Sequence, residues 1–433
     1  MSETVLLVGG GGREHAIAEA IADGPAAELV ACASNRNPGI EALSTAYREI
    51  GSSEVGEIVA FGESVGATLA IIGPESALAA GVADALDAAG IYAFGPPAAL
   101  ARIETDKRFQ REFMAAESIA GTAAFETFDS ARAAAEYIET VGDDVAVKPR
   151  GLTGGKGVRV TGDQVTHEEA AEYVRTAEHE DWVVEERLVG EEFTLQAFVA
   201  NGSVRVSPAI QDHKRAFAGD EGPNTGGMGS YSAPAFELPF MNEDAYSRAE
   251  AILRSTAAAL EGYKGVLYGQ FMLTVNGPMV VEFNARFGDP EALNTLALLE
   301  TDLLAVLQAA RDGTALPELA FNAKATVCKY AVPAGYPTSP DAGASIDIDP
   351  EQAAAADVGL FYASVDVADG QLVTTTSRSF ALVGVAETIQ QAEAAVSEAF
   401  AETSMDGLRV RADVGSNALV ERRIEHMERL RRR

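Results

Sequence analysis

The first hundred residues alternate short β-branched runs with alanine-rich amphipathic stretches, and this alternation is the strongest constraint on the fold. Apolar runs of strand length lie at residues 5–8, 29–33, 69–72 and 91–94. Amphipathic stretches of helix length separate them at residues 14–22, 54–65 and 78–89. Repeated strand–helix–strand units place their strands in parallel and their helices on both faces of the sheet. The pattern therefore predicts an open parallel α/β sheet.

The first predicted strand runs into four glycines, Gly9–Gly12, followed by Arg13 and Glu14. Free N–H groups and the helix dipole at such a turn favour an anion. The spacing is not G-x-G-x-x-G, because Glu14 stands where the third glycine belongs. We therefore expect Gly11, Gly12 and Arg13 to hold a phosphate-bearing small substrate. A tight structural turn and a dinucleotide site are the alternatives.

A second glycine-rich segment, residues 151–158 (GLTGGKGV), lies between predicted strands at 144–147 and 158–161. It does not match the P-loop pattern, because Arg150 replaces the first glycine and Gly157 replaces the Ser/Thr that binds Mg²⁺. Strand, loop, strand is the topology of a β-flap whose N–H groups fold over phosphates. Lys148 and Lys156 would add positive charge there. A glycine hairpin with a surface lysine is the alternative.

An acidic stretch follows the next predicted strand, at Glu185, Glu186 and Glu192 with Leu188 between them. A buried strand that ends in acids can offer hinge groups to an adenine edge, and a following carboxylate can accept hydrogen bonds from ribose hydroxyls. In so acidic a chain, an acidic surface loop is the alternative interpretation.

Residues 211–215 (QDHKR) place Lys214 and Arg215 beside Asp212 and His213, and a glycine-rich stretch, GPNTGGMGS, follows at 222–230. Adjacent cations followed by a glycine loop predict a site for a phosphate or carboxylate substrate. A simple turn would also explain the glycines, and His213 would then be a solvated loop histidine.

The most specific constellation is residues 279–291, MVVEFNARFGDPE. Strand alternation puts Glu282, Asn284 and Arg286 on one face. Carboxylate and amide oxygens two residues apart suit Mg²⁺, which takes few protein ligands and keeps water and phosphate. Arg286 would then reach a transferring phosphoryl group. A half-buried strand with a Glu–Arg pair is the alternative.

Gln270, on the preceding predicted strand at 266–274, is a further candidate metal ligand. A three-residue connection with Gly277 in the left-handed conformation would place Gln270 opposite Glu282. A two-residue turn at Asn276 and Gly277 would point it away.

The net charge of −32 argues against binding to nucleic acid or to anionic membranes, because both partners would be repelled. No run of 18 apolar residues is present, and residues 1–8 lack the basic start of a signal peptide, so we expect a cytoplasmic protein. The acids are dispersed, which leads to the hypothesis of adaptation to high salt. Cys32 and Cys328 form neither a metal pattern nor a disulfide framework.

Taken together, a lysine at a strand end, a β-flap, an acidic hinge and a Glu-x-Asn-x-Arg strand resemble the ATP-grasp superfamily. GGREHA near the N-terminus, GPE at 73–75, QDHKR, GPNTGGMG and EFNARFGDPE more closely resemble the phosphoribosylamine–glycine ligase family, over residues 5 to about 310. Two segments depart from that family's pattern. Lys148-Pro149-Arg150-Gly151 stands for the usual Lys-Ala-Asp-Gly, and Glu104-Thr105-Asp106-Lys107 for the usual Gly-Ser-Lys.

The resemblance implies a Rossmann-like N-terminal substrate domain at 1–104, an ATP-grasp domain at 105–318 with its flap subdomain at about 120–188, and a small C-terminal α+β domain at 319–433. It implies ATP-dependent ligation of glycine to 5-phosphoribosylamine through glycyl phosphate, with Mg²⁺ or Mn²⁺. The expected partners are these small molecules, for a monomer or weak homodimer. Another ATP-grasp ligase, a biotin-carboxylase-like enzyme and a nonenzymatic nucleotide-binding protein are the alternatives.

The resemblance also implies roles for individual residues. The implied metal ligands are Gln270, Glu282 and Asn284, and the implied catalytic residues are Arg286, Lys214 and Asp212. The implied nucleotide-binding residues are Lys107, Lys148, Lys156, Gly154, Gly155, Gly157, Glu185, Glu186, Leu188 and Glu192. The implied substrate-binding residues are Gly11, Gly12, Arg13, Glu75, Asn224, Thr225, Gly226 and Asp289.

Overall fold

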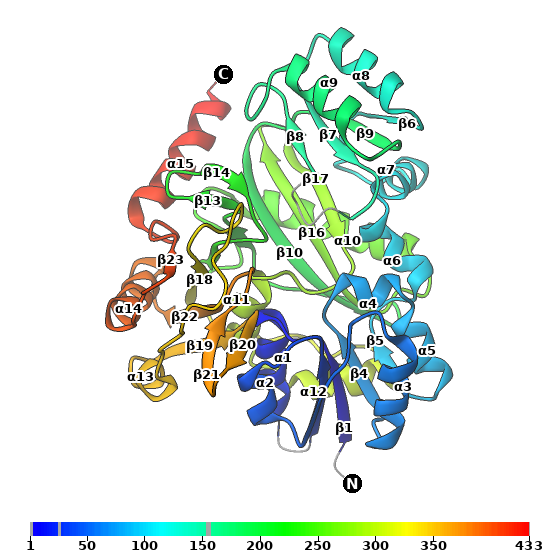
Figure 1. Ribbon diagram of the computed structural model, residues 1–433. Helices are drawn as coiled ribbons and strands as arrows, with labels where there is room; N and C mark the ends of the chain where they lie inside the picture. Colours follow the sequence, from blue (N-terminus) through cyan, green and yellow to red (C-terminus); the bar gives the residue numbers. More distant parts are fainter. Residues whose placement is uncertain (1–2, 25–26, 153–156, 433) are drawn as a thin grey trace.

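The computed structural model describes residues 3–24, 27–152 and 157–432, and it begins with a five-stranded sheet (Figure 1). All strand pairs in this sheet are parallel, in the order β3-β2-β1-β4-β5. The strands are β1 (Glu3–Val8), β2 (Ala27–Ala33), β3 (Ala46–Glu49), β4 (Leu69–Ile72) and β5 (Tyr92–Phe94). The helices are α1 (Gly12–Ala22), α2 (Pro38–Leu43), α3 (Val55–Ser64), α4 (Glu75–Ala79) and α5 (Val82–Ala88). The predicted parallel sheet is confirmed, although α2 and β3 had not been predicted.

Both faces of this sheet are buried, because alternate residues of β1 enter different clusters. Leu6 and Val8 pack with Phe61 of α3, while Val5 and Leu7 pack with Ile17 of α1. The second cluster also includes Leu307 of α12 (Leu303–Arg311). A helix far along the chain therefore ties the N-terminal sheet to the rest of the molecule.

A four-stranded sheet with two helices forms a separate layer, residues 125–186, which we call the lid layer (top of Figure 1). Its strand order is β6-β9-β7-β8, and its helices α8 and α9 pack together. Strands β7 and β8 are antiparallel and flank the glycine-rich segment, as predicted. The elements are β6 (Phe125–Phe128), α8 (Ala131–Thr140), β7 (Val145–Pro149), β8 (Arg159–Val160), α9 (His167–Thr176) and β9 (Trp182–Glu186), preceded by α6 (Ala98–Thr105) and α7 (Lys107–Ala116).

A ten-stranded sheet forms the body of the molecule. Its path is β17-β16-β10-β12-β15-β18-β22-β19, with β11 beside β10 and β23 beside β18. Because β15 pairs with β18, the sheet continues across the domain boundary predicted near residue 318. The boundaries themselves stay a prediction.

The strands of this sheet are β10 (Glu191–Ala200), β11 (Ser203–Val206), β12 (Ile210–Asp212), β15 (Gly229–Ser232), β16 (Gly265–Thr274), β17 (Gly277–Asn284), β18 (Ala325–Pro333), β19 (Val358–Tyr362), β22 (Phe380–Ala386) and β23 (Leu408–Val410). Its helices are α10 (Glu243–Ala259), α11 (Glu291–Leu298), α13 (Pro350–Ala355), α14 (Ile389–Glu402) and α15 (Asn417–Arg431). A small hairpin pairs β20 (Val365–Ala368) with β21 (Gln371–Thr374). Among the described residues, no helix is both long enough and apolar enough to cross a membrane.

The register between β16 and β17 places Gln270 opposite Glu282 through a β-bulge. Thr274 pairs with Gly277, so the turn consists of Val275 and Asn276 and is neither of the two predicted turns. The partner of Phe271 is Val280, and Val281 is therefore the extra residue of the bulge. The bulge, and not the turn, shifts Gln270 onto Glu282.

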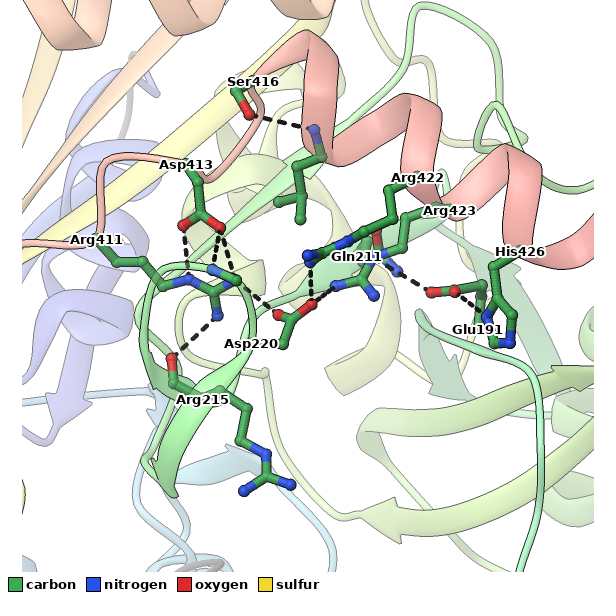
Figure 2. A network of polar contacts seen from close by, with 12 residues as sticks. Glu191, Gln211, Arg215, Asp220, Arg411, Asp413, Ser416, Arg422, Arg423 and His426 are labelled. Atoms are coloured by element: carbon green, nitrogen blue, oxygen red, sulfur yellow. Dashed lines mark hydrogen bonds and ion pairs between the residues drawn. The ribbon is translucent and has the colours of Figure 1, made fainter. Parts of the chain in front are cut away.

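A second hairpin, β13 (Arg215–Phe217) with β14 (Glu221–Asn224), is held by arginines from the C-terminal segment (Figure 2). Asp220 lies at its corner with a φ of 62°. Arg411 Nη2 lies 2.6 Å from Asp220 Oδ1, and Arg423 Nη2 lies 2.6 Å from Oδ2, where Arg422 also contacts. We call these four residues the arginine clasp. It fastens the hairpin to α15 and to the chain after β23.

We expect Asp220→Ala to lower the free energy of unfolding by about 2–4 kcal/mol, because it removes one of the two carboxylates that pair with the fully buried Arg411 and the carboxylate that Arg422 and Arg423 share. Equilibrium denaturation by guanidinium chloride measures the change. The matched control is Glu425→Ala, which removes an exposed carboxylate of α15 and should change stability by no more than about 0.5 kcal/mol. Equal effects of the two substitutions would contradict a stabilising clasp.

Candidate functional site

Three lysines from different elements converge on Glu282 of β17. Lys214 Nζ lies 3.9 Å from Glu282 Oε1. Burial raises the pKa of Glu282, but Lys214, Lys148 and Lys107 outweigh burial and hold that pKa below its ordinary value. The structure therefore brings the predicted metal ligand together with predicted catalytic and nucleotide-binding lysines. Three ammonium groups around one carboxylate leave an excess of positive charge, which suits a polyanion.

Gln270 and Glu192 form the wall beside this cluster. The Gln270 side-chain N–H donates to Glu192 Oε2 at 2.6 Å, and its amide oxygen accepts from Lys214. The amide oxygen predicted to bind a metal is thus occupied by an ammonium group in this structure. Asn284 is half-buried on the same strand face as Glu282.

The donor set fits a cation that takes few protein ligands. Within the described part of the chain, no three or more His, Cys, Asp or Glu side chains gather closely enough to hold a metal ion. Glu282 is 31% exposed and lies two residues from Asn284. One carboxylate with one amide oxygen suits Mg²⁺ or Mn²⁺, because such ions keep water and phosphate oxygens as their other ligands.

The carboxylate of Glu185 is buried between two cations. Arg111 of α7 donates from Nε to Oε1 at 2.8 Å and from Nη2 to Oε2 at 2.7 Å, and Lys148 Nζ lies 2.8 Å from Oε2. Burial raises the pKa of Glu185, but Arg111 and then Lys148 outweigh it and lower that pKa to about 2. Glu185 therefore fixes the direction of Lys148. Sequence analysis missed Arg111, whose only signal is a charge among the buried positions of α7.

The other predicted nucleotide residues border the lid layer. Glu186 is exposed and accepts from the Ala124 N–H at 2.9 Å, while Leu188 is half-buried. Lys107 Nζ donates to the Gly151 carbonyl at 2.8 Å, and the Gly157 carbonyl accepts from the Tyr173 hydroxyl at 3.1 Å. Gly154, Gly155 and Lys156 lie outside the described residues.

Arg286 pairs with two carboxylates of the N-terminal helices, and it also helps to lower the pKa of Glu282. Its Nη2 lies 2.9 Å from Glu104 Oε1 of α6, and its Nε lies 3.6 Å from Glu75 Oε2 of α4. Burial raises the pKa of Glu104 to about 7, although Arg286 opposes that rise. The predicted substrate residue Glu75 and the predicted catalytic residue Arg286 are therefore neighbours.

The glycine turn after β1 meets the same segment. Arg13 donates from Nη1 to the Phe287 carbonyl at 2.9 Å and from Nε to Glu14 at 2.8 Å. The Gly11 N–H already donates to Glu14 Oε2 at 2.7 Å. A Cβ on Gly12 would lie 2.1 Å from the Tyr330 hydroxyl, so only glycine allows this close approach. The turn is thus packed against Tyr330 of the ten-stranded sheet and against the segment that follows β17.

Arg378 links the two remaining predicted substrate segments and was missed by sequence analysis. Its Nη1 donates to the carbonyls of Gly226 and Gly227 at 2.9 and 3.0 Å, and its Nη2 lies 2.9 Å from Asp289 Oδ2. Tyr330 donates its hydroxyl to Asp289 Oδ1 at 2.7 Å. Asp289 is therefore neutralised by protein groups.

The glycine loop itself is closed on Lys214. Thr225 donates both its backbone N–H and its hydroxyl to the Lys214 carbonyl, each at 2.8 Å, and Asn224 pairs with Arg215 in the hairpin. His213 is only 2% exposed, which excludes the solvated-loop alternative. Its backbone N–H donates to the Gly229 carbonyl at 2.9 Å.

Asp212 is half-buried, and its Oδ1 atom is buried without a hydrogen-bond partner. Burial raises its pKa well above the ordinary value, and the nearby Glu291 raises it further, while Lys214 opposes both. Glu291 accepts from the Tyr268 hydroxyl at 2.7 Å. A buried, unpartnered carboxyl oxygen beside a second carboxylate is a receptor for a small cation.

These features define the class. A lid layer that carries Lys148 lies over a body sheet whose strand β17 carries Glu282 and Asn284, and this is the arrangement of the ATP-grasp enzymes. Solved structures agree in fold. The biotin carboxylase domain of a 2-oxoglutarate carboxylase from Hydrogenobacter thermophilus superposes with a TM-score of 0.73 at 17% identity, covering 99% of this chain and 94% of that one.

Sequence comparison gives the family. The patterns of phosphoribosylglycinamide synthetase match in its N domain at residues 3–104, its ATP-grasp (A) domain at 105–292 and its C domain at 326–417. The chain belongs to this phosphoribosylglycinamide synthetase family and is an ATP-grasp ligase.

Individual relatives carry the name phosphoribosylamine–glycine ligase. The Methanosarcina barkeri protein is 48% identical, with 99% of each chain covered. The Methanococcoides burtonii protein is 49% identical over 99% of this chain and 100% of its own. The crystal structure from Thermotoga maritima superposes with a TM-score of 0.80 at 26% identity, covering 95% of this chain and 99% of that one.

We expect Glu185→Gln to destabilise the protein by about 3–5 kcal/mol at neutral pH, because Arg111 and Lys148 stay buried without their counter-ion. The pKa of Glu185 is lowered to about 2, so its stabilising contribution is complete above about pH 4.5 and is lost as the pH falls toward 2. The difference in unfolding free energy between wild type and variant should therefore shrink over that range. Denaturant titrations at several pH values measure it, with Glu186→Gln as the matched neighbour; a difference independent of pH would contradict the assignment.

Proposed function

We propose that this chain joins glycine to 5-phosphoribosylamine at the expense of ATP, giving glycinamide ribonucleotide, ADP and phosphate. The observation that carries the proposal is the convergence of Lys107, Lys148 and Lys214 on the half-exposed Glu282. The names of the relatives support this choice of substrates.

The lysines and Glu282 serve the nucleotide. Lys148, aimed by Glu185, and Lys107 lie where they neutralise phosphate oxygens as charge develops in the transition state. Glu282 and Asn284 would hold Mg²⁺ or Mn²⁺, which would offset the charge of the phosphates. Gln270 supports this site as the partner of Lys214 and Glu192. The border residues Glu186 and Leu188 are the proposed hinge for the adenine.

The chemistry proceeds in two displacements, because a free carboxylate is a poor acyl donor. A glycine carboxylate oxygen attacks the γ-phosphorus, the bond to the β–γ bridging oxygen breaks, and ADP leaves with that electron pair. The sugar amine then attacks the glycyl carbonyl, phosphate leaves, and the amine loses a proton. No step needs a covalent enzyme nucleophile, since positioning and charge stabilisation lower the barrier.

The buried acids suit the other end of glycine. Its ammonium group would meet the unpartnered Asp212 carboxylate with Glu291 close by, while Lys214 lies on the side of the transferred phosphoryl group. Arg286 remains the proposed second cation for that group. Because the acidic groups of Asp212 and Glu291 lie beside the ammonium group of Lys214, the site suits a molecule whose own ammonium and carboxylate groups are a short distance apart.

We place the sugar phosphate where the N-terminal sheet meets the body of the molecule. We propose that it lies near the glycine turn and the glycine loop, with residues Gly11, Gly12, Arg13, Glu75, Asn224, Thr225, Gly226 and Asp289 around it. A monomer or weak homodimer, a cytoplasmic location and adaptation to high salt complete the proposal; the last is supported by the net charge of −32.

The direct test is ADP release at high salt with Mg²⁺, adding glycine and freshly generated phosphoribosylamine separately and together. Release that requires both supports the ligase. Release with other carboxylates or bicarbonate would overturn the substrate, and binding of ATP without any release would overturn the catalytic claim.

We expect Glu282→Gln to lower kcat at least about 100-fold and to weaken the dependence of the rate on Mg²⁺ concentration, because phosphate charge loses part of its stabilisation. Steady-state ADP release across a Mg²⁺ titration measures both effects. Glu261→Gln, at an exposed position before β16, is the matched control and should behave as wild type. Near-normal turnover of Glu282→Gln would contradict the metal assignment.

We expect Asp212→Asn to raise KM for glycine about tenfold or more, with little change in affinity for ADP. Because the pKa of Asp212 is raised, the carboxyl stays neutral to a higher pH than usual. In the wild type, KM for glycine should therefore fall as the pH rises through this pKa, and the variant should lack that fall. Initial rates over a pH series test it, and identical pH profiles would exclude Asp212 as the ammonium receptor.

A further inference from the structure

The β13–β14 hairpin contacts the lid layer as well as the C-terminal segment. The guanidinium of Arg215 donates from Nη1 to the Gly222 carbonyl at 2.7 Å within the hairpin. Its Nη2 lies 3.1 Å from Oδ2 of Asp163. Asp163 belongs to the turn between β8 and α9, so this ion pair joins the body to the lid layer.

The body end of this pair is held rigidly. Arg411 donates to the Arg215 carbonyl at 3.0 Å, Arg409 donates to the Ala216 carbonyl at 2.8 Å, and the Gly219 N–H donates to Asp413 at 2.9 Å. Figure 2 shows the Arg215 side chain extending away from the arginine clasp. Because the hairpin is fixed before Arg215 meets Asp163, little side-chain entropy is left to lose when the pair forms.

The lid end reaches the edge of the lid sheet. Asp163 follows β8, the edge strand, and β8 pairs with β7, which carries Lys148 one residue before its end. On the other side of the lid sheet, Lys148 of β7 donates to the Val281 carbonyl of the body at 3.0 Å, and Glu185 of β9 pairs with Arg111 of α7. The Asp163–Arg215 ion pair therefore restrains the β8 edge of the lid sheet, on the side of β7 away from β9.

We propose that Arg215 and Asp163 form a latch that positions the lid layer over the nucleotide. This inference rests on the proposed function for the identity of the nucleotide. Both residues act through Lys148 and are positioning residues. The Arg215 side chain is 25% exposed and the Asp163 side chain 50%. The ion pair therefore raises the population in which the lid layer is positioned over the nucleotide by about two- to fivefold, and salt weakens this effect.

The test is a charge exchange. Dissociation constants for ATP and ADP with Mg²⁺ are measured by calorimetry, without turnover, for Asp163→Arg, Arg215→Asp and the double variant, at low salt and at about 1 M salt. Each single variant places like charges together and should raise the dissociation constant at least about twofold at low salt. The double variant should return to within about 1.5-fold of wild type, and the differences should fade at high salt.

The controls separate a latch from a structural role. Glu126→Arg changes an exposed acid on β6, at the far edge of the lid sheet, and should leave nucleotide affinity unchanged. If Arg215→Asp does not fold, Asp163→Asn replaces it as the test variant, because this substitution removes the ion pair at a half-exposed turn. It should raise KM for ATP with kcat and the unfolding temperature kept.

Two outcomes would overturn the latch: single variants that bind nucleotide as wild type does, or a double variant in which the two effects add without rescue. Failure of the proposed function would give a different result. The charge exchange between Arg215 and Asp163 would still change the dissociation constants for ATP and ADP, but glycine-dependent turnover would be absent.

Discussion

The buried group of Glu185, Arg111 and Lys148 is the interaction on which the arrangement of the site depends. Glu185 comes from β9 and Lys148 from β7, both in the lid layer, while Arg111 comes from α7. Arg111 also donates to the carbonyls of Val280 and Val281 at 3.0 and 2.8 Å. One network therefore joins the lid layer, the helix before it and the strand that carries Glu282. Buried charges of this kind are costly when unpaired, so the geometry tolerates little variation.

The β-bulge in β17 makes this network possible. Val281 has no partner in β16, and its carbonyl accepts from both Arg111 and Lys148, the latter at 3.0 Å. The same one-residue shift places Gln270 opposite Glu282, where it contacts Lys214. A single irregularity thus supplies acceptors for the buried cations and also sets the wall of the site. Had the strands paired regularly beyond Phe271 and Val280, Gln270 would have stood opposite Val281, and Glu282 would have pointed to the other face of the sheet.

The parallel sheet, the strand–loop–strand topology and the strand that carries Glu282 could be predicted from the sequence, because each depends on a pattern among neighbouring residues. For Gln270 the sequence left two positions open, each tied to a turn. The structure has the position opposite Glu282, but a bulge that has no local signal is the cause. Arg111 and Arg378 were missed because their partners lie 74 and 89 residues away, at Glu185 and Asp289. The two segments that depart from the family pattern contact each other, because one supplies Arg150 and the other Asp106. Arg150 Nε lies 3.0 Å from Asp106 Oδ1, and Arg150 Nη2 lies 2.8 Å from Oδ2. Only the folded chain shows that such changes compensate one another.

Arginine is suited to the places where loops and hairpins are held together, because of the geometry of its side chain. Arg378 serves three carbonyls and one carboxylate, and Arg411 serves two carboxylates and the Arg215 carbonyl. A planar fork with five donors can do this from one position, whereas a lysine offers a single point charge. Lysines take both roles. Lys107, Lys148 and Lys214 lie near Glu282, where a compact charge suits phosphate. Lys329 is buried and instead holds Glu393 and the Ala412 carbonyl in place. In a chain with 33 Lys and Arg against 65 Asp and Glu, the cations are thus divided between those that hold loops in place and those that surround Glu282.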